Sequence, residues 1–307
     1  MANILVVGSI NMDLVVRVPH SPVPGETVLG GDFETFPGGK GANQAVAAAR
    51  MGGNVTMVGR VGKDDFGDTL IQILVEDKIK TTHVIKDSKA PTGIAMIAVA
   101  DDGENLIVVA SGANHQVSVE DINNTRSLMR ETDLLLLQLE CPLTVVSAAI
   151  DLAVAYDIPV VLNPAPAQPL PQSLLSNVDY LTPNEHELAL LAGEKDLDQA
   201  IQTLLSWGVR NLVVTLGANG ARVINGEGIN QHLPAHEITA VDTTAAGDAF
   251  NGALAVALAE GKPLLDSVRY GMAAGALAAT KRGAQPSLPT REAVESLMKI
   301  QGGGHSG

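Results

Sequence analysis

Short apolar segments alternate with alanine- and leucine-rich segments along most of this chain, and this alternation strongly constrains the fold. Five apolar segments have the length of buried strands and are mostly bounded by Gly, Asp or Asn: residues 4–7, 56–61, 134–139, 159–162 and 212–216. Five others have helical patterns: residues 42–50, 66–76, 144–156, 185–191 and 199–207. Strands separated by helices form parallel sheets with both faces covered. The chain is therefore predicted to be an α/β protein with three layers, α/β/α, around a mostly parallel central sheet.

Two stretches interrupt this alternation. Residues 12–18, and residues 92–99 with 106–110, alternate like strands but are not followed by helices. Asp101–Asn105 has the composition of a hairpin turn. We expect a small antiparallel sheet, formed by segments of about 12–36 and 92–112 inserted into a single domain of residues 1–300. It is either a lid over the carboxyl edge of the main sheet or a plain edge hairpin. Residues 301–307 are predicted to be a flexible tail.

Charge and composition exclude several classes of protein. The chain has 20 Lys and Arg against 34 Asp and Glu, a net charge of −14, and only 3% aromatic residues. Binding to nucleic acid needs the opposite charge, so no nucleic-acid partner is expected, and acidic chains also avoid anionic membranes. The N-terminus has no basic region, and no apolar run is long enough to span a membrane. We expect a cytoplasmic protein with no membrane association.

Several catalytic and ligand-binding motifs are missing from the sequence. It has no P-loop, no G-x-S-x-G and no H-E-x-x-H, and the first strand does not lead into the G-x-G-x-x-G of a dinucleotide site. His232 and His236 have the spacing of a helical metal pair, but Pro234 between them breaks a helix. The single cysteine, Cys141, excludes a disulfide framework, and its apolar surroundings favour a buried, inert thiol over a nucleophile.

The segment Val241-Asp-Thr-Thr-Ala-Ala-Gly-Asp-Ala-Phe-Asn-Gly252 carries the sharpest chemical signal. Apolar residues at helical spacing follow it, so a helix is predicted to begin near Ala245 with Asp248 in its first turn. The free amides of Ala246, Gly247 and Asp248 then form an anion-binding end. A carboxylate beside such amides suits phosphoryl transfer, because it can accept a hydroxyl proton while the amides hold developing charge. Alternatively, Asp248 only stabilises the start of the helix.

Three further segments could bind ligands. Phe36-Pro-Gly-Gly-Lys-Gly-Ala-Asn-Gln44 is a glycine-rich turn that can approach a small molecule closely, or an ordinary turn before a helix. Thr182-Pro-Asn-Glu-His-Glu187 reads as a capping box with Thr182 at the N-cap and Glu185 at N3. Asn184 and Glu187 would then share a face suited to a magnesium–phosphate group, or simply to solvent. Thr215-Leu-Gly-Ala-Asn-Gly220 follows a strand and could hold a nucleotide or form a β-turn.

Together these motifs resemble the ribokinase branch of the PfkB-type carbohydrate kinases. The resemblance spans almost the whole chain, from Gly8-Ser-Ile-Asn-Met-Asp13 to Gly283-Ala-Gln-Pro-Ser287. It rests on five specific motifs: Pro24-Gly-Glu-Thr27, Gly38-Gly-Lys-Gly-Ala-Asn43, Asn163-Pro-Ala-Pro166, Asn184-Glu-His-Glu187 and Asp242-Thr-Thr-Ala-Ala-Gly-Asp248. The resemblance implies transfer of a phosphoryl group from MgATP to the 5-hydroxyl of ribose, giving ribose 5-phosphate and ADP.

The resemblance also assigns roles to individual positions. Asp248 matches the family's catalytic base, and the matching anion hole is Ala245, Ala246 and Gly247. The positions that match the sugar site are Asn11, Asp13, Gly38, Gly39, Lys40, Asn43 and Glu140. Those that match the phosphate, Mg²⁺ and nucleotide contacts are Asn184, Glu187, Thr215, Gly217 and Gly220; Met272 stands where ribokinases often carry a histidine near adenine. The matching K⁺ site comprises Asp242, Thr244, Ala278, Lys281, Gly283 and Ser287.

The resemblance further implies that the lid pairs two subunits, so a homodimer is expected. Three alternatives remain at this stage. A sibling kinase acting on 2-deoxyribose, another sugar or a nucleoside would share the phosphate machinery. A non-catalytic sugar-binding protein would have no need of Asp248 beside Gly247. A dinucleotide oxidoreductase would need the glycine fingerprint that the first strand lacks.

Overall fold

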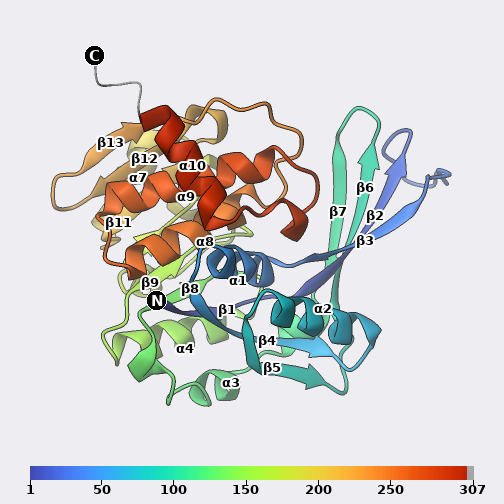
Figure 1. Cartoon of the computed structure of the whole chain (residues 1–307), viewed down its shortest axis with the longest axis horizontal. Coiled ribbons are helices and arrows are strands. Elements are labelled where there is room, and N and C mark those ends of the chain that lie inside the picture. Colours follow the sequence, from blue (N-terminus) through green and yellow to red (C-terminus); the bar gives the residue numbers. More distant parts are fainter. Residues whose placement is uncertain (303–307) are drawn as a thin grey trace.

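The computed structural model describes residues 1–302, and their centre is a nine-stranded sheet (Figure 1). Its strands lie in the order β13-β12-β11-β10-β9-β8-β1-β4-β5. Neighbouring strands from β11 to β5 run parallel, whereas β12 and β13 add an antiparallel edge. This confirms the predicted mostly parallel sheet. The strands are β1 (Asn3–Val7), β4 (Asn54–Gly62), β5 (Lys80–Asp87), β8 (Leu134–Leu137), β9 (Val160–Leu162), β10 (Tyr180–Leu181), β11 (Asn211–Thr215), β12 (Ala221–Asn225) and β13 (Asn230–Leu233).

Helices cover both faces of this sheet, which gives the three layers predicted from the sequence. One face carries α1 (Lys40–Arg50), α2 (Asp65–Glu76), α8 (Ala246–Ala259), α9 (Leu264–Ala279) and α10 (Arg291–Gly302). The other carries α3 (Val119–Asn123), α4 (Leu143–Val154), α5 (Gln172–Leu175), α6 (Glu185–Ala192) and α7 (Leu197–Ser206). β1 shows why both faces must be covered: Ile4 and Val6 belong to one core, and Leu5 and Val7 to the other.

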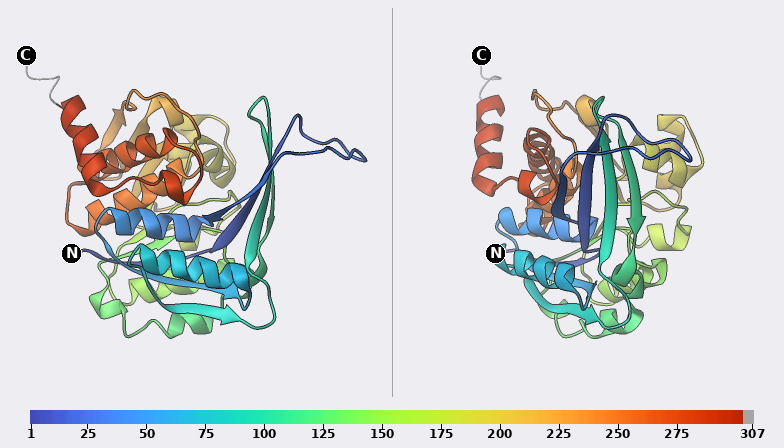
Figure 2. Two further views of the ribbon diagram at one scale, coloured as in Figure 1. Left: turned by 45° about the vertical axis from the view of Figure 1, so that its right-hand side comes forward. Right: turned by 90° about the vertical axis from the view of Figure 1, so that its right-hand side faces the viewer.

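The two inserted segments form a second, four-stranded sheet, here named the lid, which stands away from the body, most clearly in the turned views of Figure 2. Its order is β3-β2-β6-β7, from β2 (Asn11–Val18), β3 (Phe33–Gly38), β6 (Gly93–Ala100) and β7 (Asn105–Ala110). The outer pairs are antiparallel as expected, but the central pair β2–β6 is parallel, so the lid sheet is mixed. Both central strands leave the body in the same direction, and each is followed by a returning strand.

The ends of the chain refine two other predictions. The predicted tail begins too early, because α10 continues through Gln301 and Gly302; the rest of it lies outside the described residues. Within residues 1–302, no helix is long and apolar enough to cross a membrane.

Candidate active site

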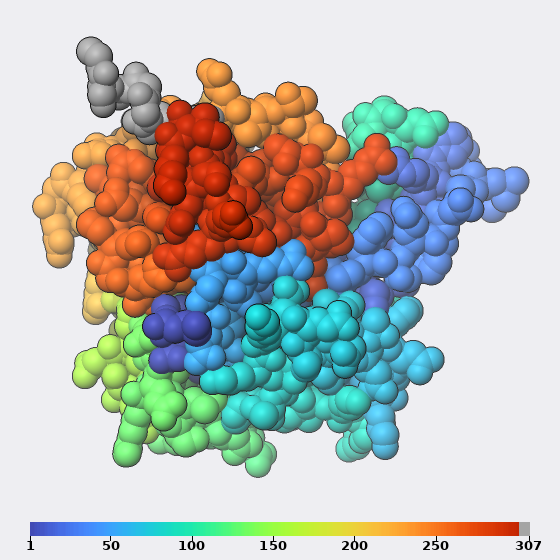
Figure 3. Space-filling model, in the orientation of Figure 1, coloured from blue at the N-terminus to red at the C-terminus, as the bar shows by residue number. Residues whose placement is uncertain are grey.

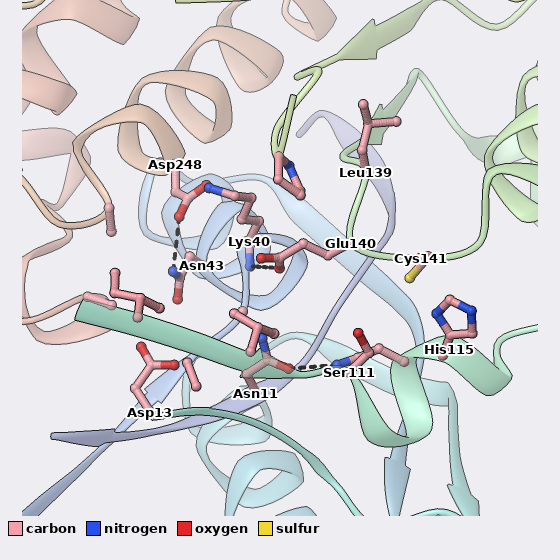
Figure 4. Close-up of a pocket in the computed structure, with 18 of the residues that line it drawn as sticks. Asn11, Asp13, Lys40, Asn43, Ser111, His115, Leu139, Glu140, Cys141 and Asp248 are labelled. Atoms are coloured by element: carbon pink, nitrogen blue, oxygen red, sulfur yellow. Dashed lines mark hydrogen bonds between the residues drawn. The ribbon is translucent and has the colours of Figure 1, made fainter. Parts of the chain in front are cut away.

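A cleft of about 650 Å³ lies at the carboxyl edge of the parallel strands, between the body and the lid (Figure 4). Its walls come from the segments that follow β1 and β8, from the first turns of α1 and α8, and from lid strands β6 and β7. The space-filling view in Figure 3 shows how far the lid projects beyond the body. The cleft collects the principal carboxylates singled out from the sequence: Asp13, Glu140 and Asp248.

Asp248 lies in the first turn of α8, as predicted, and is buried at the inner wall of the cleft. Its Oδ2 accepts a hydrogen bond from Asn43 Nδ2 at 3.0 Å and its Oδ1 accepts one from Gln44 Nε2 at 2.9 Å. Burial raises the pKa of Asp248, whereas the charge of Lys40 and the two amide donors oppose that rise. The site therefore holds a carboxylate that is both oriented and desolvated, as a general base requires.

The turn before Asp248 has the shape of an anion-binding helix end. Ala245 adopts a left-handed backbone (φ 58°) and precedes the first residue of α8. The N–H of Ala246 is already bonded to the carbonyl of Thr243 at 3.1 Å, so it is less available than the sequence suggested. Gly247 is exposed, and open space surrounds the place where a side chain would begin. A phosphate could therefore approach the first-turn amides of Gly247 and Asp248.

The glycine-rich turn before α1 allows a close approach between backbone segments. Gly39 has a positive φ of 87°, and a Cβ there would lie 2.7 Å from the backbone nitrogen of Asn11. A Cβ on Gly38 would lie 2.3 Å from a carboxylate oxygen of Asp13. The backbone contact and positive φ at Gly39 require glycine, whereas a side chain at Gly38 would displace the Asp13 carboxylate; both contacts bring the lid strand β2 against the start of α1.

Lys40 supplies the positive charge of the cleft. Burial lowers the pKa of Lys40, but four carboxylates outweigh burial and raise that pKa above its ordinary value: Asp248, Glu140, Glu187 and Asp13. Its backbone N–H also donates to Glu140 Oε2 at 2.9 Å, and the same oxygen accepts the hydroxyl of Ser9. The pKa of Asp13 rises to about 7, first because of burial and then because of the neighbouring negative charges.

Asn114 fixes the start of the lid beside Asn11. Its Oδ1 accepts the Ile10 N–H at 2.8 Å, and its Nδ2 donates to Asn11 Oδ1 at 2.6 Å. The Nδ2 of Asn11 therefore remains to donate into the cleft that Asn11 lines. The sequence analysis did not identify Asn114 or Ser9, because their hydrogen-bond partners, Asn11 and Glu140, lie 103 and 131 residues away in the sequence.

The predicted capping box is wrong. The N-cap of α6 is Asn184, whose Oδ1 accepts from the Glu187 N–H, while Glu187 Oε2 accepts from the Asn184 N–H, both at 2.8 Å. The hydroxyl of Thr182, the predicted N-cap, donates to Asn251 Oδ1 instead. Asn184 and Glu187 thus have a structural role, although each keeps further hydrogen-bonding capacity. Burial raises the pKa of Glu187, and the bond from the Asn184 N–H and the charge of Lys40 oppose this rise.

The candidate nucleotide contacts lie outside the cleft. Thr215 ends β11 and forms an isolated parallel bridge with Asn184, which joins the two segments. Gly217 begins the short 3-10 turn η3 (Gly217–Asn219) with a φ of 55°, whereas Gly220 is buried with a φ of 91°. Met272 lies on α9, half-buried against the core.

The candidate cation residues lie in two adjoining segments, the loop before α8 and the end of α9 with the turns that follow it. Asp242 Oδ1 accepts the Thr244 N–H and its Oδ2 accepts the Gly283 N–H, both at 2.9 Å. Burial raises the pKa of Asp242, but these bonds outweigh burial and lower it. The backbone carbonyl of Ala278 accepts the Lys281 N–H at 3.1 Å, and Ser287 is buried in the 3-10 turn η4 (Gln285–Ser287). The two segments therefore hold each other beside the start of α8.

Cys141 lines the cleft but is buried, and burial raises the pKa of its thiol to about 12. This confirms that the cysteine is buried, as predicted. Within residues 1–302, no group of three or more His, Cys, Asp or Glu side chains is arranged to hold a metal ion.

The fold and the cleft together define a kinase of small hydroxylated molecules: a carboxylate that can accept a proton lies beside an anion-binding helix end and a set of hydroxyl-binding groups. Residues 1–291 match the profile described as "pfkB family carbohydrate kinase". The chain belongs to this family of carbohydrate kinases.

Individual relatives agree with that assignment. A ribokinase of Haemophilus influenzae is 42% identical over 292 residues, which cover 94% of this chain and 95% of that protein. The crystal structure of a ribokinase from Thermotoga maritima is 41% identical, with a TM-score of 0.91 over 97% of this chain and 100% of that one. An Arabidopsis thaliana ribokinase complexed with ribose and ATP is 33% identical, with a TM-score of 0.88 over 97% of this chain and 99% of that one.

Proposed function

We propose that this protein is a ribokinase, which transfers the γ-phosphoryl group of ATP to the 5-hydroxyl of D-ribose to give D-ribose 5-phosphate and ADP. This proposal rests on the buried Asp248 carboxylate, which two amides hold at the start of α8 in a cleft lined by carboxylate and amide side chains. The relatives named ribokinase, one of them complexed with ribose and ATP, support the choice of substrates. We place the reaction in the cytoplasm, where ATP is abundant.

Asp248 would act as the general base. Each of its carboxylate oxygens accepts one amide hydrogen bond, which leaves a lone pair for the sugar hydroxyl. The hydroxyl oxygen then attacks the γ-phosphorus in line, and the proton passes to Asp248. The first-turn amides of Gly247 and Asp248, presented by the turn at Ala245 and Ala246, would stabilise the charge that develops on the phosphoryl oxygens, with Gly247 leaving room for them.

The sugar would lie between Asp248 and the lid. Asn11 and Asp13 from β2 and Glu140 after β8 would bind its hydroxyls, with Gly38, Gly39, Lys40 and Asn43 completing the site. Asn43 Oδ1 is buried without a hydrogen-bond partner, and a sugar hydroxyl could supply one. Closing the lid over this site would exclude water and limit hydrolysis of ATP.

The nucleotide would lie along Thr215, Gly217, Gly220 and Met272, with its phosphates near Asn184 and Glu187. Mg²⁺ usually binds through substrate phosphates and one or two carboxylates, which fits a buried carboxylate such as Glu187. When bound, Mg²⁺ neutralises negative charge on the phosphates.

A monovalent cation such as K⁺ would bind among the carbonyl oxygens of the segments at Asp242, Thr244, Ala278, Lys281, Gly283 and Ser287. The lowered pKa of Asp242 fits this role, since it keeps an ionised carboxylate beside these carbonyls. Such a cation would steady the turn that leads into α8. Replacing K⁺ with Na⁺ or with a bulky organic cation should lower kcat; equal rates in the three salts would refute the cation site.

We further propose that the lid pairs two copies of the chain. β7 is an edge strand whose residues are all exposed, and its apolar side chains are Leu106, Ile107, Val108 and Val109. Ile107 and Val109 line the cleft, whereas Leu106 and Val108 do not. An exposed apolar edge strand favours pairing with a second chain. Leu106→Asp combined with Val108→Asp should give a monomer in analytical ultracentrifugation; a monomeric parent protein would refute the pairing.

The acceptor is tested by ADP release from MgATP in the presence of K⁺, with D-ribose, 2-deoxyribose, fructose and adenosine compared side by side. A rate with ribose well above the others is expected. A faster rate with another acceptor would identify a sibling kinase, and binding of ribose without ADP release would indicate a binding protein.

The base is tested by Asp248→Asn, which should lower kcat by roughly a hundredfold or more while ribose still binds. Asp266→Asn is the matched control, because Asp266 also lies in the first turn of a helix but is exposed. It should leave kcat unchanged. A near-normal kcat in Asp248→Asn would remove that residue from its role.

A further inference from the structure

Gln44 is completely buried on α1, and both hydrogens of its side-chain amide are donated in hydrogen bonds. Its Nε2 donates to Asp248 Oδ1 at 2.9 Å and to Asn163 Oδ1 at 3.0 Å. Its Oε1 accepts from Gln138 Nε2 at 2.6 Å. A buried amide with all of these bonds made is held rigidly, since any rotation leaves a polar group unpaired.

The direction of this amide follows from the charge of Asp248. Turning the Gln44 amide over would place its carbonyl oxygen against the Asp248 carboxylate and its NH₂ against the NH₂ of Gln138. In the orientation that the structure shows, Gln138 acts as a lock, because the hydrogen it donates keeps the NH₂ of Gln44 facing Asp248, while its own Oε1 is buried without a hydrogen-bond partner. Asn163 is itself anchored, with its Nδ2 donating to the Thr182 carbonyl at 3.2 Å.

Close helix packing sets the distance between Gln44 and Asp248. A Cβ on Gly252 of α8 would lie 2.5 Å from Ala47 Cβ and 2.8 Å from the Gln44 carbonyl oxygen. Asp248 lies one helical turn before Gly252, and Gln44 lies about one turn before Ala47. The helix contact therefore brings the Gln44 amide to the Asp248 carboxylate without any flexible segment between them.

We propose that Gln44 is the positioning residue of this kinase: locked by Gln138, it aims the Asp248 carboxylate at the acceptor hydroxyl and stabilises its ionised form. This inference rests on the proposed function of Asp248 as the base. Gln44 is distinct from Asn43, because Asn43 lines the cleft and would touch the sugar, whereas Gln44 acts only through Asp248.

The charges around Asp248 explain why a neutral donor is needed there. Burial is the largest influence on the pKa of Asp248 and raises it, Lys40 on α1 lowers it, and Glu140 after β8 raises it further. Asp13 on β2 and Glu187 on α6 also interact electrostatically with Asp248 and, as carboxylates, disfavour its ionised form. The hydrogen bond from Gln44 favours that ionised form without adding another charge to the cluster.

The test compares wild type with Gln44→Met, which keeps the length of the side chain but cannot donate. A hydrogen bond to a charged group of this kind is worth roughly a ten- to hundredfold effect. We expect kcat with ribose to fall by about that factor while the KM for ribose stays within about twofold. The acid limb of the kcat–pH profile should move up by about one pH unit or more.

Two further variants separate positioning from loss of fold. Gln138→Met leaves Gln44 in place but removes its lock, so the acid limb should move in the same direction by a smaller amount. Thr125→Val removes a buried hydroxyl in the turn after α3 and should change neither kcat nor the pH profile. If Gln44→Met fails to fold, Gln138→Met carries the same test.

A direct titration keeps this inference separate from the proposed function. The carboxyl carbon of Asp248 is followed by ¹³C NMR in the sugar-free protein and assigned with Asp248→Asn. An upward shift of its pKa in Gln44→Met and Gln138→Met supports the inference, whereas unchanged titrations and pH profiles in both variants overturn it. Failure of the proposed function is instead seen in the wild type alone, as no ADP release with any acceptor.

Discussion

Adding one methyl group at Gly252 should disable catalysis more than it destabilises the fold. The Cβ of Gly252→Ala would lie 2.5 Å from Ala47 Cβ and 2.8 Å from two backbone atoms, Ala48 N and Gln44 O. Carbon atoms in ordinary contact are about 3.5–4.0 Å apart, so α1 and α8 would have to separate by about 1 Å. Neither helix can relieve the contact by a rotamer change, since backbone atoms form much of it.

The two effects of this substitution differ in size. Overpacking a core costs about 1–3 kcal/mol, but alanine is favoured over glycine in a helix by about 1 kcal/mol. The net loss of about 0–2 kcal/mol lowers Tm by no more than about 3 °C, taking about 2.1 cal/mol/K of unfolding entropy per residue over 307 residues. No such compensation exists for catalysis: a displacement of about 1 Å at Asp248 costs about a hundredfold in kcat.

The assay measures kcat with ribose and ATP, together with Tm by calorimetry. Gly226→Ala is the matched control, because Gly226 lies between β12 and β13 and a Cβ there meets nothing within 4 Å. The control should leave both quantities unchanged. If Gly252→Ala keeps the wild-type kcat, the close helix contact does not position Asp248, and the reasoning is refuted.

Two other substitutions test the electrostatics. The pKa of Asp13 is about 7 in the folded protein, against an ordinary value of 3.8. Between about pH 4 and pH 7 the folded protein therefore binds more protons than the unfolded chain. Its free energy of unfolding falls as the pH rises from about 4 to 7 and then levels off. Asp13→Asn should remove this dependence and raise the Tm of the sugar-free protein at pH 8; an equal change in Tm between pH 5 and pH 8 in both proteins would contradict it. Arg60 binds both carboxylate oxygens of Asp121, at 2.8 and 3.0 Å, and Asp121 is 6% exposed. Arg60→Met should lower the free energy of unfolding in urea by roughly 2–3 kcal/mol. This is less than for a fully buried ion pair, because Arg60 is itself partly exposed. A loss below about 0.5 kcal/mol would show that the ion pair contributes little to stability.

The sequence predicted those features of the fold that depend on local patterns. Apolar runs located the strands β1, β4, β8, β9 and β11, and helical periodicity located the start of α8 with Asp248 in its first turn. Such patterns are readable because the 2.0 and 3.6 residue periods involve only near neighbours. The helix end at Gly247 was visible for the same reason, since orphan amides at a helix start are a local property.

The sequence pattern gave the wrong N-cap for α6, because two residues fitted the capping-box pattern equally well. Thr182 and Asn184 are each followed three residues later by a glutamate, so either could cap α6. The choice was made by tertiary contacts, because Thr182 is buried and bonded to Asn251 of α8, 69 residues away. In the lid sheet, the parallel pair β2–β6 joins strands about 80 residues apart. A hairpin turn motif predicts pairing only between strands that are adjacent in the sequence, so it could not predict this pair.

The sequence by itself determined the fold class, a mostly parallel central sheet and the motifs proposed to carry the chemistry. Only the tertiary structure decided how the charged and amide groups meet: Gln44, Gln138 and Asn163 carry no spacing signal, because their bonds join residues 94 to 204 positions apart. These partners become neighbours only when α1 packs against α8 above the carboxyl ends of β8 and β9. Burial also raises the pKa of Asp248, because packing removes water from its carboxylate, and no sequence motif predicts this effect.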